Sequence, residues 1–209
     1  MLKLTVVVPC YGRPQRTVRV CENILSQTLI GWEAFFIGDG CPEFQKLLDE
    51  GYFEAASKKA RANGNVIIAS NLPNHYGGYG YEIRNRVKSL ANGEFICFVD
   101  NDDMILHNHF ENYYNAISQT DNDFMYFNTY LKPTDHVRYS ELEFGKIGHA
   151  ELIIRTDFYK RLPPQGADYG HDWKLISSML EYGAKYEKAE TLPTYVIMGV
   201  GEMREKEID

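Results

Sequence analysis

The chain has 209 residues, and its 29 acidic and 22 basic side chains give a formal net charge of −7 at pH 7. Hydrophobic residues make up 44% and charged residues 24%, which indicates an ordinary soluble globular protein of a single domain. The acidic balance argues against a nucleic-acid partner held by a basic surface.

Neither an integral membrane segment nor a disulfide framework is predicted. No apolar run is long enough to span a bilayer, and no signal peptide opens the chain. The four cysteines, at positions 10, 21, 41 and 97, fit neither metal-ligand pairs nor a dense set of disulfides. We therefore expect a reduced, cytoplasmic protein.

The first hundred residues alternate short apolar strands with helices. Predicted strands cover residues 2–9, 32–37, 66–69 and 95–99. Predicted helices begin at Pro14, cover residues 43–62 with a break near Gly51, and cover residues 81–90. This alternation predicts a mostly parallel sheet with right-handed crossovers. The glycine-rich loop 71–80 either lets the backbone approach a ligand closely or simply flexes.

After residue 103 the predicted elements are less regular. Helices are expected over residues 108–119 and 173–181, and strands over 124–130, 151–154, 186 and 194–200. The segment 132–146 is polar, which predicts a loop over a binding face. The charged segment from residue 202 is expected to form a loose tail.

Three carboxylates follow the buried strand 95–99 directly, at Asp100, Asp102 and Asp103. Carboxylates this close repel one another, and a divalent cation relieves that repulsion. Ligands of open α/β sheets bind at the carboxyl ends of the strands, which is where these residues fall. The cluster therefore predicts a metal site that holds a phosphate-bearing substrate. The alternative is a solvated turn in which Asp103 caps the next element.

Several motifs, in this order along residues 4–183, resemble family 2 glycosyltransferases. They are Thr5-Val-Val-Val-Pro-Cys-Tyr11, Phe36-Ile-Gly-Asp39-Gly-Cys41, Gly78 to Asn85, Gly93 to Asp103, Gly148 to Arg155, and Gly170-His-Asp172 before a helix. Each is loose alone, but their common order is specific. Two positions depart from the family pattern: Gly38 replaces the first of two acids, and His171 replaces a glutamate before Asp172.

The resemblance implies an α/β protein with a GT-A (Rossmann-like) fold: a single domain with a mostly parallel central sheet flanked by helices. Residues 1–103 would form the nucleotide-binding half and residues 104–209 the acceptor and catalytic half. The implied activity is metal-dependent transfer of a sugar from a nucleoside-diphosphate sugar to an acceptor hydroxyl. A UDP-sugar is the favoured donor, Mn²⁺ or Mg²⁺ the cofactor, and a glycan or small molecule the acceptor.

The resemblance also assigns roles to single residues. For the nucleotide, Pro9 and Tyr11 would line the base pocket, Asp39 would bind the base, Arg84 would approach the nucleotide and Asp100 would contact the ribose. Asp102 would bind the metal, with Asp103 or His171 as further candidate ligands. Gly148 and His149 would approach the donor sugar, and Asp172 would be the general base.

Several of these assignments have structural alternatives. Asp39 and Asp172 could cap helices. Tyr11 could be a turn residue packed on the surface, Arg84 and His171 could be surface residues, and His149 could be a satisfied loop histidine.

Other activities remain open from the sequence. A retaining glycosyltransferase shares the nucleotide half, so the expected inversion with Asp172 as base is less firmly implied than the reaction class. A phosphatase of the aspartyl-phosphate kind also places D-x-D after an apolar strand, although usually at the start of its domain. A non-catalytic nucleotide-binding module is the third alternative, because of the departures at Gly38 and His171.

Overall fold

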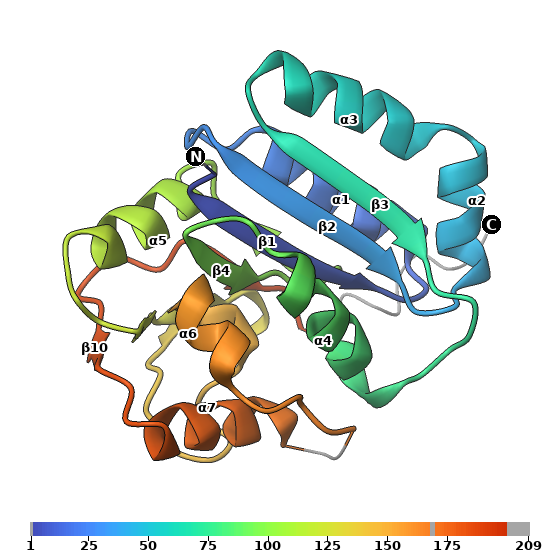
Figure 1. Cartoon of the computed structure of the whole chain (residues 1–209). Coiled ribbons are helices and arrows are strands. Elements are labelled where there is room, and N and C mark those ends of the chain that lie inside the picture. The colour runs from blue at the N-terminus through green and yellow to red at the C-terminus, as the bar shows by residue number, and fades with distance from the viewer. Residues whose placement is uncertain (1, 168–169, 200–209) are drawn as a thin grey trace.

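The computed structural model describes residues 2–167 and 170–199 and is built on a seven-stranded sheet (Figure 1). Its order is β10-β6-β9-β4-β1-β2-β3. The strands are β1 Leu4–Cys10, β2 Trp32–Gly38, β3 Val66–Asn71, β4 Phe95–Phe98, β6 Phe124–Tyr126, β9 Leu152–Arg155 and β10 Tyr186–Lys188. The first four are parallel to one another, whereas β9 runs antiparallel between β4 and β6. The chain winds outward from β1 to β3 and then returns to β4 on the other side of β1.

Helices cover both faces of this sheet (Figure 1). One apolar cluster joins the sheet to α1 Pro14–Leu25, α2 Pro42–Asp49, α3 Tyr52–Ala62 and α5 His109–Ser118. The other joins it to α4 Tyr81–Leu90, α6 Thr156–Arg161 and α7 His171–Glu181. Successive strand side chains point to opposite faces, so Val6 and Val8 of β1 pack in the first cluster and Val7 in the second. The predicted α/β architecture, mostly parallel and flanked by helices, is confirmed.

A second, four-stranded sheet of order β5-β11-β7-β8 was not predicted. Its strands are β5 Met104–Ile105, β11 Tyr195–Ile197, β7 Thr129–Leu131 and β8 His136–Arg138. The strand expected over 124–130 therefore divides between the two sheets, and the loop expected over 132–146 contains a 3₁₀ turn, Lys132–Thr134, and β8. β11 falls within the strand expected over 194–200, but strands of two or three residues are too short to show a period, so β5 and β8 were not predicted.

Other details agree with the sequence or refine it. The helix break near Gly51 is present, with that glycine at φ 76° between α2 and α3. The last helix begins at His171, two residues before its predicted start. The cysteines are free and buried. In the described residues, no helix has the length and apolar character to cross a bilayer. The expected tail from residue 202 lies outside the described residues, as do residues 168–169 and 200–209 of the predicted second half.

Candidate active site

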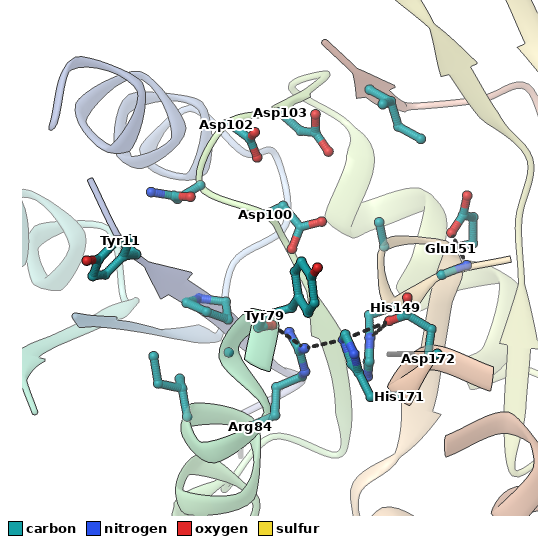
Figure 2. Close-up of a pocket in the computed structure, with 18 of the residues that line it drawn as sticks. Tyr11, Tyr79, Arg84, Asp100, Asp102, Asp103, His149, Glu151, His171 and Asp172 are labelled. Atoms are coloured by element: carbon teal, nitrogen blue, oxygen red, sulfur yellow. Dashed lines mark hydrogen bonds and ion pairs between the residues drawn. The ribbon is translucent and has the colours of Figure 1, made fainter. Parts of the chain in front are cut away.

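A cavity of about 760 Å³ opens at the carboxyl ends of β1 and β4, where the strand order reverses (Figure 2). Such a switch point is where open α/β sheets bind ligands. Residues far apart in the sequence meet here, because the neighbouring strands end at one edge. Every residue predicted for the site lines this cavity: Pro9, Tyr11, Asp39, Arg84, Asp100, Asp102, Asp103, Gly148, His149, His171 and Asp172.

One wall of the cavity carries Tyr11, Asp39 and His75. The Tyr11 ring stacks on His75, with ring centroids 4.2 Å apart and 27° between the planes. Asp39 is buried, and its two oxygens accept hydrogen bonds from the backbone N–H groups of Tyr76 and Gly77, each 2.9 Å long. An ionised carboxylate has about four acceptor positions, so Asp39 can order this loop and still accept from a nucleobase.

The structure answers two questions that the sequence left open at this wall. Helix α2 is capped by Cys41, whose sulfur accepts from the N–H of Phe44, so Asp39 is not the cap. A Cβ on Gly38 would lie 2.3 Å from Oδ1 of Asn71. The Asn71 side chain bonds both the N–H and the carbonyl of Cys41, each at 3.0 Å. Glycine at 38 therefore leaves room for the side chain that holds the turn after β2.

Asp102, the predicted metal ligand, forms an ion pair with Arg13. Its backbone carbonyl also accepts a hydrogen bond of 2.9 Å from Nη2 of Arg19. Arg13 stands immediately before α1 with φ 51°, a left-handed conformation that non-glycine residues rarely adopt. A cation from the protein itself thus already lies against this carboxylate, which the sequence did not indicate.

Asp103 instead secures the second sheet. Its Oδ2 accepts from the Tyr195 hydroxyl at 3.0 Å, and its Oδ1 accepts from the backbone N–H of Met198 at 2.9 Å. The same hydroxyl accepts from the backbone N–H of Asp100 at 2.9 Å. Asp103 is buried, and both of its oxygens are engaged by the segment around β11. This arrangement favours an anchoring role over the metal-ligand role expected as an alternative.

Burial, together with mutual repulsion, raises the proton affinity of Asp100 and Asp103. Desolvation, followed by repulsion from Asp100, raises the pKa of Asp103 to about 7. Desolvation at the cavity floor also raises the pKa of Asp100; the Arg84 cation opposes this shift, and repulsion from Asp102 adds to it. The site therefore has an unmet demand for positive charge, the condition that a divalent cation satisfies.

A pH-dependent stability follows from Asp103. Because its folded pKa lies near 7, above the usual 3.8, the folded protein keeps a proton that the unfolded chain has lost in that interval. The stabilisation that Asp103 gives the folded protein is fully present below about pH 4 and is lost as the pH rises through 7. We expect Asp103→Asn to flatten the fall in unfolding free energy between pH 5 and 7.5, measured in urea. The exposed Asp157→Asn serves as control, and an unchanged slope in Asp103→Asn would contradict the assignment.

The opposite wall carries His149, His171 and Asp172 (Figure 2). Nδ1 of His149 lies in direct contact with Oδ1 of Asp172, and Nε2 of His171 lies 3.4 Å from the same oxygen. The two imidazole rings stack, with centroids 5.1 Å apart. Burial lowers the pKa of His149 well below its usual value, and the Arg84 charge adds to this effect; both favour the neutral ring.

These three residues form the only cluster of three potential metal ligands among residues 2–167 and 170–199, with ligand atoms within 4.8 Å of one another. However, Nη2 of Arg84 lies 2.9 Å from Nε2 of His171. A guanidinium carries only donors, so it occupies the imidazole lone pair that a metal would need and adds a repelling charge. His171 also lies across the cavity from Asp102 (Figure 2), and its expected alternative role as a metal ligand is not supported.

Arg84 is a buried residue, which corrects the alternative of a surface arginine, while its expected approach to the nucleotide stays a prediction. Its Nη2 donates to the Tyr79 carbonyl at 2.5 Å, and its Nε donates to Oε1 of Gln165 at 3.2 Å. With the His171 contact, the guanidinium joins the glycine loop to the start of α7 (Figure 2). Desolvation lowers its pKa, and the charge of Asp100 opposes that shift.

A buried carboxylate, Glu151, and its partly buried partner Arg138 lie beside the cavity and were not singled out from the sequence. Glu151 is 1% exposed; its Oε1 accepts from Arg138 at 3.0 Å, and its Oε2 accepts from the Gly148 N–H at 2.7 Å. Arg138 reaches it from β8, a strand that was not predicted. The one available sequence signal for this pair was the position of Glu151, a charged residue directly before the buried β9. This pair fixes the turn that carries Gly148 and His149, the two residues expected near the donor sugar.

Comparison with known proteins relates the chain to one family. The sequence profile of glycosyl transferase family 2 matches residues 5–181. Glycosyltransferase GlyG of Streptococcus pneumoniae serotype 4 is 28% identical over 127 residues. The matched region is 61% of this chain but 39% of GlyG, so the chain spans well under half the length of that relative.

Solved structures share the fold at low sequence identity. S. aureus TarS 1–349 in complex with UDP has a TM-score of 0.73 at 17% identity, covering 96% of this chain and 62% of that chain. Its complex with UDP-GlcNAc gives 0.72 and 18%, covering 95% and 59%. A mannosyltransferase from Pyrobaculum calidifontis in complex with GDP-Man and Mn²⁺ gives 0.67 and 15%, covering 93% and 56%. The expected GT-A fold is confirmed.

Proposed function

Because the chain belongs to glycosyl transferase family 2, we propose that it transfers a sugar from a nucleoside-diphosphate sugar to an acceptor hydroxyl. The observation that carries the proposal is the shape of the cavity. A base pocket at Tyr11 and Asp39, an acidic wall at Asp100 and Asp102, and a carboxylate at Asp172 on the opposite wall enclose one space of about 760 Å³. Its volume lies within the range typical of small-molecule sites.

The donor would lie along the wall formed by β1, β2 and β4. Tyr11 and His75 offer ring faces to a nucleobase, and Asp39 accepts its N–H. Uracil, which has such an N–H, is the favoured base, and complexes of TarS with UDP and UDP-GlcNAc support this choice. Asp100, which is exposed to the cavity beside Asp102, would accept from the ribose hydroxyls.

The carboxylates fit a hard divalent cation. Asp102, with Asp100 beside it, offers the oxygen ligands that Mn²⁺ and Mg²⁺ prefer, and such ions are commonly held by one or two carboxylates plus substrate phosphates. The Pyrobaculum relative was solved with Mn²⁺. A bound cation would neutralise charge on the leaving diphosphate. Asp102 must first break its ion pair with Arg13 before it can bind a metal ion. We therefore expect weak metal binding in the absence of nucleotide.

Asp172 would act as general base. Its carboxylate is 37% exposed, faces the cavity from the first turn of α7, and can accept the proton of an attacking hydroxyl. A single displacement of this kind inverts the anomeric centre. Tyr79 and Phe144 border the same cavity with exposed rings. Flat apolar rings suit the face of a sugar, which supports a glycan acceptor over a small polar one.

Thermal-shift measurements with nucleotide sugars, with and without Mn²⁺, test the donor assignment, because binding to the folded state raises the melting temperature. UDP-sugars with Mn²⁺ should give the largest shift. Radiolabelled sugar transfer to glycan acceptors, with NMR of the product anomer, then tests catalysis. A retained anomer would point to a retaining enzyme, turnover of phosphomonoesters alone to a phosphatase, and binding without transfer or hydrolysis to a non-catalytic module.

The ion pair at Asp102 gives a prediction for the metal. Arg13→Ala should strengthen Mn²⁺ binding to the nucleotide-free protein by about two- to fivefold, since a partly exposed ion pair of this kind is worth up to about 1 kcal/mol. Titration followed by Mn²⁺ electron paramagnetic resonance measures this directly. Arg61→Ala, an exposed arginine on α3, is the control. Equal affinities in the Arg13 variant and the wild type would show that the metal does not compete with Arg13.

A further inference from the structure

His149 contacts the carboxylate that the proposed reaction needs, and this contact defines its role. We propose that His149 is a positioning residue that fixes Asp172 in the orientation in which it receives the proton of the acceptor. The inference rests on the proposed function and goes beyond it, because it assigns a task to a residue expected only to approach the donor sugar. It starts from the contact between Nδ1 of His149 and Oδ1 of Asp172 (Figure 2).

The partners fix the proton positions on both imidazoles. A carboxylate only accepts, so the contact with Asp172 requires the proton on Nδ1 of His149. A guanidinium only donates, so the 2.9 Å contact with Arg84 requires a bare Nε2 on His171. That nitrogen cannot donate to Asp172, 3.4 Å away. In the described residues, His149 is therefore the side chain that holds the Asp172 carboxylate by donation.

The His149 ring has little freedom to turn. It is 4% exposed and lies between the edge-on contact of Phe98, at 5.1 Å, and the stacked ring of His171, also at 5.1 Å. The turn that carries His149 is also held in place, because Glu151 accepts a hydrogen bond of 2.7 Å from the Gly148 N–H. A side chain packed in this way can act as a rigid reference for a mobile neighbour.

Asp172 needs such a reference because of its place in α7. It lies in the first turn after Gly170, where backbone N–H groups have no partner within the helix. A carboxylate there readily turns back to accept from those N–H groups and stabilise the helix. Holding Oδ1 at His149 opposes that rotation and leaves Oδ2 for the acceptor hydroxyl.

Three substitutions separate positioning from packing. The amide nitrogen of Asn can take the place of Nδ1, whereas Gln places its donor further out and Phe has none. We expect His149→Phe and His149→Gln to lower kcat by about 10- to 100-fold, the range associated with a small misplacement of a catalytic group. KM for the donor and the thermal shift with UDP should change less than about twofold, because the substitutions leave the contacts that bind the donor in place. His149→Asn should recover kcat to within about threefold of wild type. His107→Phe, an exposed histidine, is the control.

Combination with Asp172→Asn shows whether the effect passes through that carboxylate. If His149 acts only on Asp172, adding His149→Phe to Asp172→Asn lowers kcat no further. Wild-type kcat in His149→Phe, equal losses in His149→Asn and His149→Phe, or additive losses in the double variant would each overturn the proposal.

One readout does not depend on turnover. In ¹H–¹⁵N NMR, the Nδ1–H of His149 should be slowly exchanging and downfield in the wild type, and should lose both properties in Asp172→Ala. An active wild type in which this signal is absent refutes the positioning role alone. A wild type that shows the signal but transfers no sugar refutes the proposed function and leaves the contact intact.

Discussion

Replacing Asp172 by asparagine should lower kcat by about 100- to 10,000-fold, the usual contribution of a general base. The amide has nearly the same shape and can still accept from His149 through its oxygen, so the position of the side chain is kept while its basicity is lost. Binding of UDP, judged by thermal shift, should stay close to wild type, because the base pocket and the acidic wall are unchanged. Transfer to the glycan acceptor is the quantity to measure.

The matched control is Asp157→Asn. Asp157 lies in the first turn of α6, as Asp172 lies in the first turn of α7, so both variants remove a negative charge from a helix N-terminus. The control should leave kcat unchanged and cost a similar small amount of stability. Retention of more than a tenth of wild-type kcat in Asp172→Asn would exclude the proposed base.

The second large effect concerns stability, at the buried pair of Arg138 and Glu151. Arg138→Met should lower the unfolding free energy by about 2 to 3 kcal/mol, below the 3–5 kcal/mol typical of a broken buried pair because Arg138 is 28% exposed. Adding Glu151→Gln should recover much of the loss, since a neutral amide tolerates burial better than an unpaired carboxylate. Urea denaturation of the single and double variants measures both quantities.

The same pair predicts a pH dependence. Burial raises the pKa of Glu151 above its usual 4.5, and Arg138 opposes the shift, so removal of Arg138 raises that pKa further. The folded state then keeps its proton at pH values where the unfolded chain has lost it, and stability falls as the pH rises. The loss caused by Arg138→Met should be larger at pH 8 than at pH 5. A loss independent of pH would show that packing, not charge, is what the variant removes.

The sequence predicted the larger part of the fold because the strands β1, β2 and β4 are continuous apolar runs with clear turn signals. It did not predict β9 as an antiparallel neighbour of β4, since the four-residue run Leu152–Arg155 carries no mark of its direction. The second sheet was not predicted from the sequence, for a related reason. Its strands pair across long separations, as Tyr195 does with Ile105, and such pairings leave no local pattern.

The site was predictable as a set of residues but not as a set of contacts. Tyr11, Asp39 and Asp100 follow parallel strands that end at one edge of the sheet, and His149 precedes β9, which begins at that edge because it is antiparallel to β4. The partners that decide their states come from elsewhere: Arg13 at Asp102, and Tyr195 at Asp103. Arg84 shows the limit clearly, because a helical arginine beside a glycine loop suggests an anion contact, and only the packing reveals that the side chain is buried.

The position of Arg84 has a consequence for redesign of the proposed donor site. Its guanidinium bonds the Tyr79 carbonyl on one side and contacts His171 on the other, and the Tyr79 ring stacks on His171, so these contacts join the glycine loop to the start of α7. A change of donor base sought in that loop would also disturb the alignment of Asp172. Tyr11 stands on the loop after β1, outside the glycine loop. We expect libraries at that position to alter the choice of nucleotide while the alignment of Asp172 is kept.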